Sequence, residues 1–272
     1  VAIGRLALSA TTDGADNIAI GRSALAVSGN DGDTNIAIGL AALGTGDVAG
    51  AGNIGIGASA LTALTGGTNN IGIGLTSGDA LTGGTDNVAI GRLALSASPD
   101  GADNIAIGRS ALAVSDGVAD CNIAIGLSAL GGADVSGLAN IAIGALAADA
   151  LTTGICNVSI GVNALGAATT SCQNVAIGEL AMGTGTNVAI GSIAIGVSAG
   201  AAITSGACNV MIGACAGKAM TLGLNNVFIG RQVAEGITTE VVDDNIAIGR
   251  QALLGSSSTT GDGNIALGIQ AI

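Results

Sequence analysis

The 272-residue chain lacks histidine, tyrosine and tryptophan, and it has a single phenylalanine, Phe228, and a single lysine, Lys218. The side chains that usually act as general bases or activate a nucleophile are therefore nearly absent. We accordingly predict no enzymatic activity, no catalytic residues and no bound cofactor. Apolar residues make up 49% of the chain although aromatic residues are almost missing, so the interior must be narrow and filled by Ile, Leu, Val and Ala.

Basic residues are also scarce, because 7 Lys and Arg stand against 19 Asp and Glu, which gives a net charge of −12. Nucleic acids and anionic membrane surfaces bind basic patches, so we expect neither as a partner. Residues 180–217 carry no charge, but Gly, Ser, Thr and Asn interrupt them every few residues. A transmembrane helix needs about 20 predominantly apolar residues, so we predict no membrane insertion. The five cysteines and the acidic loops fit no zinc or calcium motif, and we expect no metal site.

Glycine, by contrast, is abundant, with 48 residues, and many of them recur at a fixed spacing. They close a pentapeptide of the form Asn-(Ile/Val)-small-Ile-Gly, as in residues 17–21, and they return every 17 to 19 residues, with one extra copy ending at Gly191. A short fixed period indicates one supersecondary unit stacked on its neighbours. We predict an all-β parallel β-solenoid of about 16 coils that forms a single array over residues 1–272. Because both chain ends fall inside a repeat, we expect a segment of a longer fibre.

Within each pentapeptide the side chains alternate across the strand, and we predict that Ile18 and Ile20 face the interior while Asn17 and Ala19 face the other side. The apolar pair Ala24-Leu25, which recurs after most repeat glycines, predicts a second short strand in each coil. The asparagine tolerates the left-handed backbone of a corner and can stack in register with its equivalents. The predicted amide ladder consists of Asn17, Asn35, Asn53, Asn70, Asn87, Asn104, Asn122, Asn140, Asn157, Asn174, Asn209, Asn226, Asn245 and Asn264.

The residue between the two isoleucines is almost always Ala or Gly, with Ser159, Met211 and Phe228 as departures. A position that faced water would drift to Thr, Lys or Glu, so we interpret it as a face packed closely against another subunit. Met211 and Phe228 are expected to widen the array locally. The predicted interface stripe consists of Ala19, Ala37, Ala89, Ala106, Ala124, Ala142 and Ala176.

Six of the seven basic residues directly follow a repeat glycine, and every coil with Asp directly before the repeat Asn has Arg in that slot. Six extended residues span roughly 20 Å, so Asp and Arg of one coil cannot touch. Across a threefold assembly, the end of one chain's strand can approach the start of its neighbour's. The alternative is that these charges merely solvate opposite corners of the coil. The predicted inter-chain ion pairs involve Asp16, Arg22, Asp86, Arg92, Asp103, Arg109, Asp244 and Arg250.

The recurring Asn, Ala-Ile-Gly and Ala-Leu signals together resemble the head repeats of YadA-like trimeric autotransporter adhesins and related repeats of phage tail fibres. The resemblance covers nearly the whole chain. It implies a left-handed parallel β-roll, a homotrimer and an extracellular location on a cell surface or virion. It also implies attachment, with a host-cell surface receptor or glycan as a possible partner. The coils here are longer than those typical of adhesin heads, and adhesin and tail fibre stay open as alternatives.

Two further functions and two local features also stay open at this point. The chain is alternatively a subunit of a self-assembling extracellular filament, or an ice-binding β-solenoid, although no Thr-x-Thr strand ladder is visible. The extra copy at residues 187–191 is expected to take the second-strand position of its coil. Cys156 and Cys172 lie on adjacent coils, where they either form a disulfide or remain semi-buried thiols.

Overall fold

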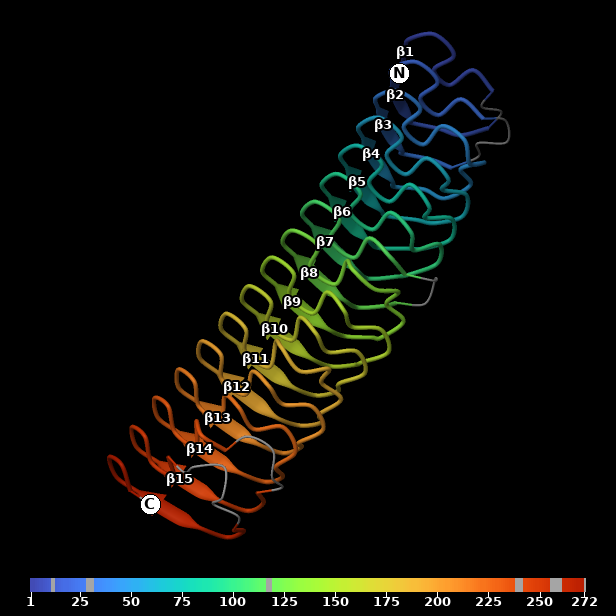
Figure 1. Ribbon diagram of the computed structural model, residues 1–272. Helices are drawn as coiled ribbons and strands as arrows, with labels where there is room; N and C mark the ends of the chain where they lie inside the picture. The colour runs from blue at the N-terminus through green and yellow to red at the C-terminus, as the bar shows by residue number, and fades with distance from the viewer. Residues whose placement is uncertain (11–12, 28–31, 116–118, 238–241, 255–260, 272) are drawn as a thin grey trace. The chain divides into compact units, whose positions relative to one another are not determined.

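The computed structural model describes residues 1–10, 13–27, 32–115, 119–237, 242–254 and 261–271 (Figure 1). The chain divides into two compact units, Val1–Leu138 and Ala139–Ile272. Both units are built from the same coil, which contains one short strand at the repeat pentapeptide. That the two form one continuous array stays a prediction.

The strands coincide with the central residues of each pentapeptide. The first unit contains β1 (Ala2–Ile3), β2 (Ile18–Ile20), β3 (Ile36–Ile38), β4 (Ile54–Ile56), β5 (Ile71–Ile73), β6 (Val88–Ile90), β7 (Ile105–Ile107) and β8 (Ile123–Ile125). The second contains β9 (Ile141–Ile143), β10 (Val158–Ile160), β11 (Val175–Ile177), β12 (Ile193–Ile195), β13 (Val210–Ile212), β14 (Val227–Ile229), β15 (Ile246–Ile248) and β16 (Ile265–Leu267).

Within each unit, consecutive strands pair in parallel and residue for residue. Ile18 lies beside Ile36 and Ala19 beside Ala37, and the same register continues from coil to coil. Parallel strands need a long connection between them, which the remaining residues of each coil supply. The predicted all-β parallel β-solenoid is therefore confirmed.

The second side of the coil differs from the prediction, because Ala24-Leu25 and its equivalents form turns rather than a strand. Ser23 and Leu25 have positive φ angles of 58° and 47°, which no β-strand allows. Their amides still bond between coils: Ser23 N donates to Arg5 O at 2.9 Å and Leu25 N to Ala42 O at 3.1 Å. Neighbouring coils are thus joined on both sides, but only one side has strand geometry.

The strands also face the opposite way from the prediction. Ala19 and Ala37 have no exposed surface, whereas Ile18 and Ile20 are half-buried. The residues proposed as an interface stripe, which are Ala19, Ala37, Ala89, Ala106, Ala124, Ala142 and Ala176, are all fully buried within their own chain. They lie at no surface of the single chain, and that prediction is wrong.

The physical reason lies in the turns. Leu43 and Leu61 are fully buried, so the turn side of the coil directs large side chains into the interior. A Cβ atom on Gly72 of β5 would lie only 2.7 Å from Leu61 Cγ. A strand that faces such a full interior has room only for Ala or Gly, and the isoleucines are left on the outside.

Met211 and Phe228 obey the same rule with the sizes reversed. Both are fully buried in β13 and β14, and the strands keep their register there. The turn position that is usually Leu is Gly200 or Gly217 in the preceding coils, and a Cβ on Gly217 would lie 3.2 Å from Phe228 Cδ2. Glycine in place of leucine at these turn positions therefore leaves room for the large side chains of Met211 and Phe228.

The irregular coil before β12 places its extra repeat copy elsewhere than predicted. Residues 187–191 lie in the segment that returns to the strand, where Ile190 bridges to Cys172 of the previous coil. Cys172 N donates to Ala189 O at 3.3 Å and Gly191 N to Cys172 O at 3.1 Å. The turn slot of this coil is taken by Met182, which is fully buried.

Candidate functional site

The most distinctive surface of each unit is the outer side of its strands, which we call the Ile–Val face. In the first unit it consists of Ile18, Ile20, Ile36, Ile38, Ile54, Ile56, Ile71, Ile73, Val88, Ile90, Ile105, Ile107, Ile123 and Ile125. In the second unit it consists of the first and third residues of β9 to β16. All of these side chains are half-buried or exposed in the single chain: Ile143 and Ile248 are 36% and 40% exposed, and Ile265 of β16 is 68% exposed.

The inner side of the same strands is held in place by the asparagine ladder. Asn35 N donates to Asn17 Oδ1 at 2.8 Å, and Asn53 N donates to Asn35 Oδ1 at 2.8 Å. The side-chain amides reach further, as Asn53 Nδ2 donates to Asn35 Oδ1 at 3.1 Å and to Gly67 O at 2.9 Å. These asparagines are buried, so their polar groups are satisfied inside the coil and do not interrupt the Ile–Val face.

Two details of this ladder differ from what the sequence suggested. The left-handed corner residue is not the asparagine but the residue before it, as at Asp86 with φ 58°. In the irregular coil Ser192 takes the ladder position: its N–H donates to Asn174 Oδ1 at 2.9 Å, and its Oγ accepts from Asn209 N at 3.2 Å. Asn and Ser at the ladder position thus both provide an oxygen that accepts a hydrogen bond from the backbone N–H of the next coil.

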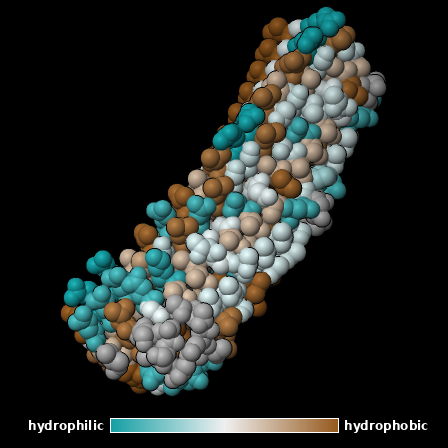
Figure 2. All heavy atoms as spheres, in the orientation of Figure 1, coloured by the Kyte–Doolittle hydropathy of each residue, from teal (hydrophilic) through white to brown (hydrophobic). Residues whose placement is uncertain are grey.

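The two edges of the Ile–Val face carry opposite charges. Arg22, Arg92 and Arg109 directly follow the repeat glycine, Asp16, Asp86 and Asp103 directly precede the repeat asparagine, and all six are exposed. Between the described residues, none of these arginines forms an ion pair with a carboxylate of the chain. In most coils without Arg the slot after the glycine holds an apolar residue, as at the exposed Leu40 and Leu75, whereas one coil of the second unit has Glu179 there. Figure 2 shows hydrophobic residues in brown interspersed with hydrophilic residues in teal on the visible surface.

The glycine between strand and arginine is required by the backbone. Gly21 and Gly108 have φ angles of 134° and 133°. A Cβ atom on Gly21 would collide with the carbonyl group of Gly39 in the next coil. Any other residue here would have a strained backbone, and its Cβ would overlap the backbone of the next coil. The glycine therefore fixes where the adjacent arginine leaves the strand.

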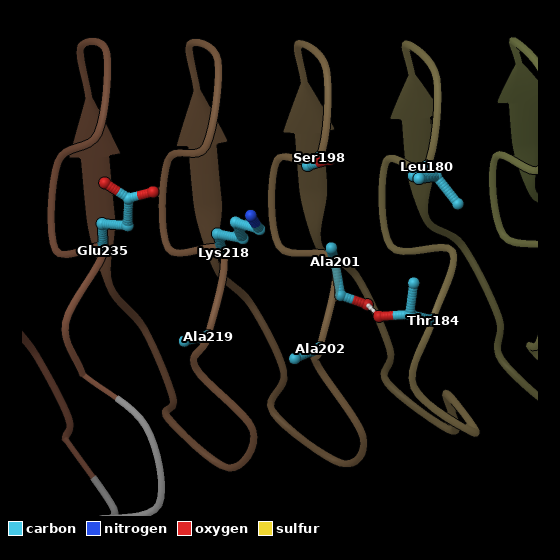
Figure 3. A pocket seen from close by; sticks show the side chains of 8 residues that line it. All are labelled: Leu180, Thr184, Ser198, Ala201, Ala202, Lys218, Ala219 and Glu235. Atoms are coloured by element: carbon cyan, nitrogen blue, oxygen red, sulfur yellow. Dashed lines mark hydrogen bonds between the residues drawn. The ribbon is translucent and has the colours of Figure 1, made fainter.

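A shallow groove of about 470 Å³ lies on the turn side of the second unit (Figure 3). Its wall includes Leu180, Thr184 and Ser198, and it also includes Lys218 and Glu235, which occupy equivalent positions on adjacent coils. Thr184 Oγ1 donates to Ala201 O at 2.8 Å, so this hydroxyl is used by the fold. In the first unit the same turn position holds Asp79, whose pKa is raised because burial disfavours its charged form. Neither arrangement pairs a nucleophile with a base.

The remaining predictions concern cysteine, metals and membranes. The five cysteines are free thiols, and Cys172 Sγ lies 3.4 Å from Thr170 O. Among the described residues, no group of three or more Cys, Asp or Glu side chains is placed to hold a metal ion. The described part of the chain likewise contains no helix that is long and apolar enough to cross a membrane.

Comparisons with protein-family models, with curated proteins and with solved structures give no match for this chain. Function must therefore be argued from the fold and from the Ile–Val face with its charged edges. The sequence-based prediction of which side of the strands faces inward is wrong. The signal that indicates the correct orientation is the leucine that recurs in the turns, as at Leu43 and Leu61, because it competes with the strand for the interior.

Proposed function

We propose that this chain is the repeat shaft or head of an extracellular fibre whose subunits associate with one another through the Ile–Val face. The observation that carries the proposal is the unbroken sequence of outward Ile and Val side chains on successive coils of each unit. Soluble monomers rarely expose contiguous apolar patches larger than a few hundred Å². In the first unit, β2 to β8 contribute two such residues each, or 7 × 2 = 14.

Burial of this face against other copies supplies the driving force for assembly. Each Å² of apolar surface removed from water contributes about 25 cal/mol, and the contribution repeats with every coil. The strands are short, but their register is regular, so every coil presents the same pair of Ile or Val side chains to a neighbouring subunit. A structural role of this kind also agrees with the scarcity of catalytic residue types.

The resemblance to trimeric adhesin heads and tail-fibre repeats supports three subunits, a left-handed coil and a location outside the cell, on a cell surface or virion. In either setting the fibre serves attachment, with a host receptor or glycan as the partner. A self-assembling filament uses the same face and differs only in how the subunits continue. The ice-binding alternative loses support, because the described strands direct Ile, Val or Leu outward and carry no outward threonine.

The test is the oligomeric state of the purified chain and of a variant with charges in the face. Ile38→Lys combined with Ile56→Lys places cations on two adjacent strands, and assembly would then bury unpaired charge. We expect the parent chain to form a defined oligomer or fibre in light scattering and electron microscopy, and the variant to remain monomeric but folded. Ala49→Lys with Gly66→Lys is the matched control, because it adds the same charges to exposed loop positions of the same coils, and a Cβ on Gly66 meets no atom within 4 Å.

A parent chain that is monomeric at tens of micromolar contradicts the proposal, as does a variant that assembles like the parent. Microscopy separates the two modes of assembly, because discrete particles indicate a closed oligomer whereas indefinitely long fibres indicate a filament.

A further inference from the structure

We infer that the Arg and Asp edges of the Ile–Val face make a second copy of this chain associate in parallel, with each coil beside the same coil of its neighbour. The inference rests on the proposed self-association. It adds the direction and the register of the partner, which the apolar face alone leaves undetermined because every level of that face is alike.

The charges occupy fixed places in the coil. In the first unit, three coils carry both members: Asp16 with Arg22, Asp86 with Arg92, and Asp103 with Arg109. In each coil, Asp lies two residues before the first strand residue and Arg two residues after the last. The segment between them spans at most roughly 20 Å, and within the described residues no ion pair joins the two charges of a coil.

The fold also stacks like charges. β6 and β7 pair in register, which places Arg92 and Arg109 on adjacent coils about 4.8 Å apart along the ladder. Asp86 and Asp103 are stacked on the opposite edge in the same way. Asp86 Oδ1 accepts a hydrogen bond from Asn69 Nδ2 at 3.1 Å, but no cation among the residues that the structure describes pairs with it. Each edge therefore lacks the counter-charge that would relieve the repulsion.

Symmetry determines which edge of the partner meets which. A rotation about an axis along the coil stack keeps two chains parallel and brings the Arg edge of one beside the Asp edge of the next. A twofold axis along the strands, or along the normal to the face, makes the chains antiparallel and brings Arg beside Arg. The charges thus favour parallel cyclic assembly, with two or three subunits, over antiparallel pairing.

The spacing of the charges along the first unit determines the register, that is, which coil of one chain lies beside which coil of the other. With no shift between neighbours, all three Arg slots face an Asp slot. If the Arg edge shifts by one coil towards the C-terminus, Arg22 faces Thr34 and Arg109 faces Cys121. The carboxylates next to these two slots, Asp33 and Asp120, already accept hydrogen bonds from Ala15 N and Ala102 N of their own chain. The coils between Arg22 and Arg92 have neither Arg nor Asp in these two slots, so of these alignments only the unshifted one pairs all three Arg slots with an Asp slot.

A zero-length cross-link tests the arrangement directly. R109K keeps the positive charge and supplies an amine, and Lys218 is the only other lysine. A carbodiimide activates a carboxyl group, which the amine attacks to form an amide while the reagent leaves as its urea. With chains mixed in light and heavy nitrogen isotopes, we expect a cross-link from position 109 of one chain to Asp103 of a differently labelled chain. A link to Asp86 or Asp16, or an assembled protein that yields only same-chain products, overturns the inference.

Charge reversal provides the second test. Arg22→Asp with Arg92→Asp and Arg109→Asp makes both edges acidic, and we expect the dissociation constant of the assembly to rise at least 10-fold. Adding Asp16→Arg, Asp86→Arg and Asp103→Arg to the same chain exchanges the edges, and assembly should return to within a few-fold of the parent. Circular dichroism verifies that each variant is folded.

The outcomes separate the two proposals. A monomeric parent refutes the self-association itself. A parent that assembles while the acidic variant assembles equally well refutes only the role of the charges, as does an edge-exchanged chain that stays as weak as the acidic variant.

Discussion

At the scale of single residues, the fold depends on matching volumes across a very narrow interior. The strand residue of one coil and the turn residue of the preceding coil share one space. Gly72 meets Leu61 there, and Phe228 meets Gly217. In these two coils the turn and strand residues therefore share one volume. Where both are small, as at Gly78 and Ala89, the buried Leu81 packs beside the glycine instead.

This matching predicts the outcome of a double substitution. Phe228→Ala should lower the free energy of unfolding by about 3–5 kcal/mol, because it leaves a cavity opposite a glycine. Gly217→Leu in the same chain restores the combination of a turn Leu with a small strand residue that Leu61 and Gly72 show, and Leu accepts the positive φ of this position, as Leu61 does with φ 51°. We expect the double variant to recover a measurable part of the loss in urea unfolding. A double variant less stable than Phe228→Ala alone would count against shared volume.

At the scale of the coil, much could be predicted from period and spacing, including the strand positions, their parallel register and the inter-coil stacking of the asparagines. The direction of the side chains could not. Alternation separates Ile18 and Ile20 from Ala19 but does not say which set faces inward. The decision falls to Leu25 and its equivalents, which were interpreted as part of a second strand. Once these leucines occupy the interior, only the small residue fits behind the strand.

The asparagine ladder gives the coil its most exacting polar requirement. Asn70 Oδ1 accepts from Asn87 N at 3.1 Å and Asn87 Nδ2 at 3.0 Å, while Asn70 Nδ2 donates to Gly84 O at 2.7 Å. Asn70→Ala leaves several buried groups without partners, each costing about 1–3 kcal/mol. Asn70→Ser should be milder, because Ser192 already shows that a hydroxyl accepts from the next coil. Thermal unfolding of the two variants should rank Ser above Ala, and equal melting temperatures would mean that the ladder contributes little.

At the scale of the molecule, the coil is the unit of change. Residues 1–28 recur at 88–115 with two differences, Thr11→Ser98 and Thr12→Pro99, after an offset of 87 residues (88 − 1). A solenoid tolerates such copying because each repeat contacts only its neighbours, and removing one interior coil costs one interface rather than the whole core. The chain should therefore tolerate the loss of a complete coil.

Deletion of residues 88–104 removes 17 residues (104 − 88 + 1) and joins Asn87 to Ile105, which preserves the repeat pentapeptide and the ladder. We expect this variant to fold with nearly unchanged circular dichroism and to melt within a few degrees of the parent. Deletion of residues 88–96 is the matched control, since it removes half a coil and sets a loop against the neighbouring strands. Its backbone amides would then lie opposite no ladder partner, and we expect a much lower melting temperature. If both deletions unfold alike, stability does not reside in nearest-neighbour coils, and the first unit must fold as one indivisible body.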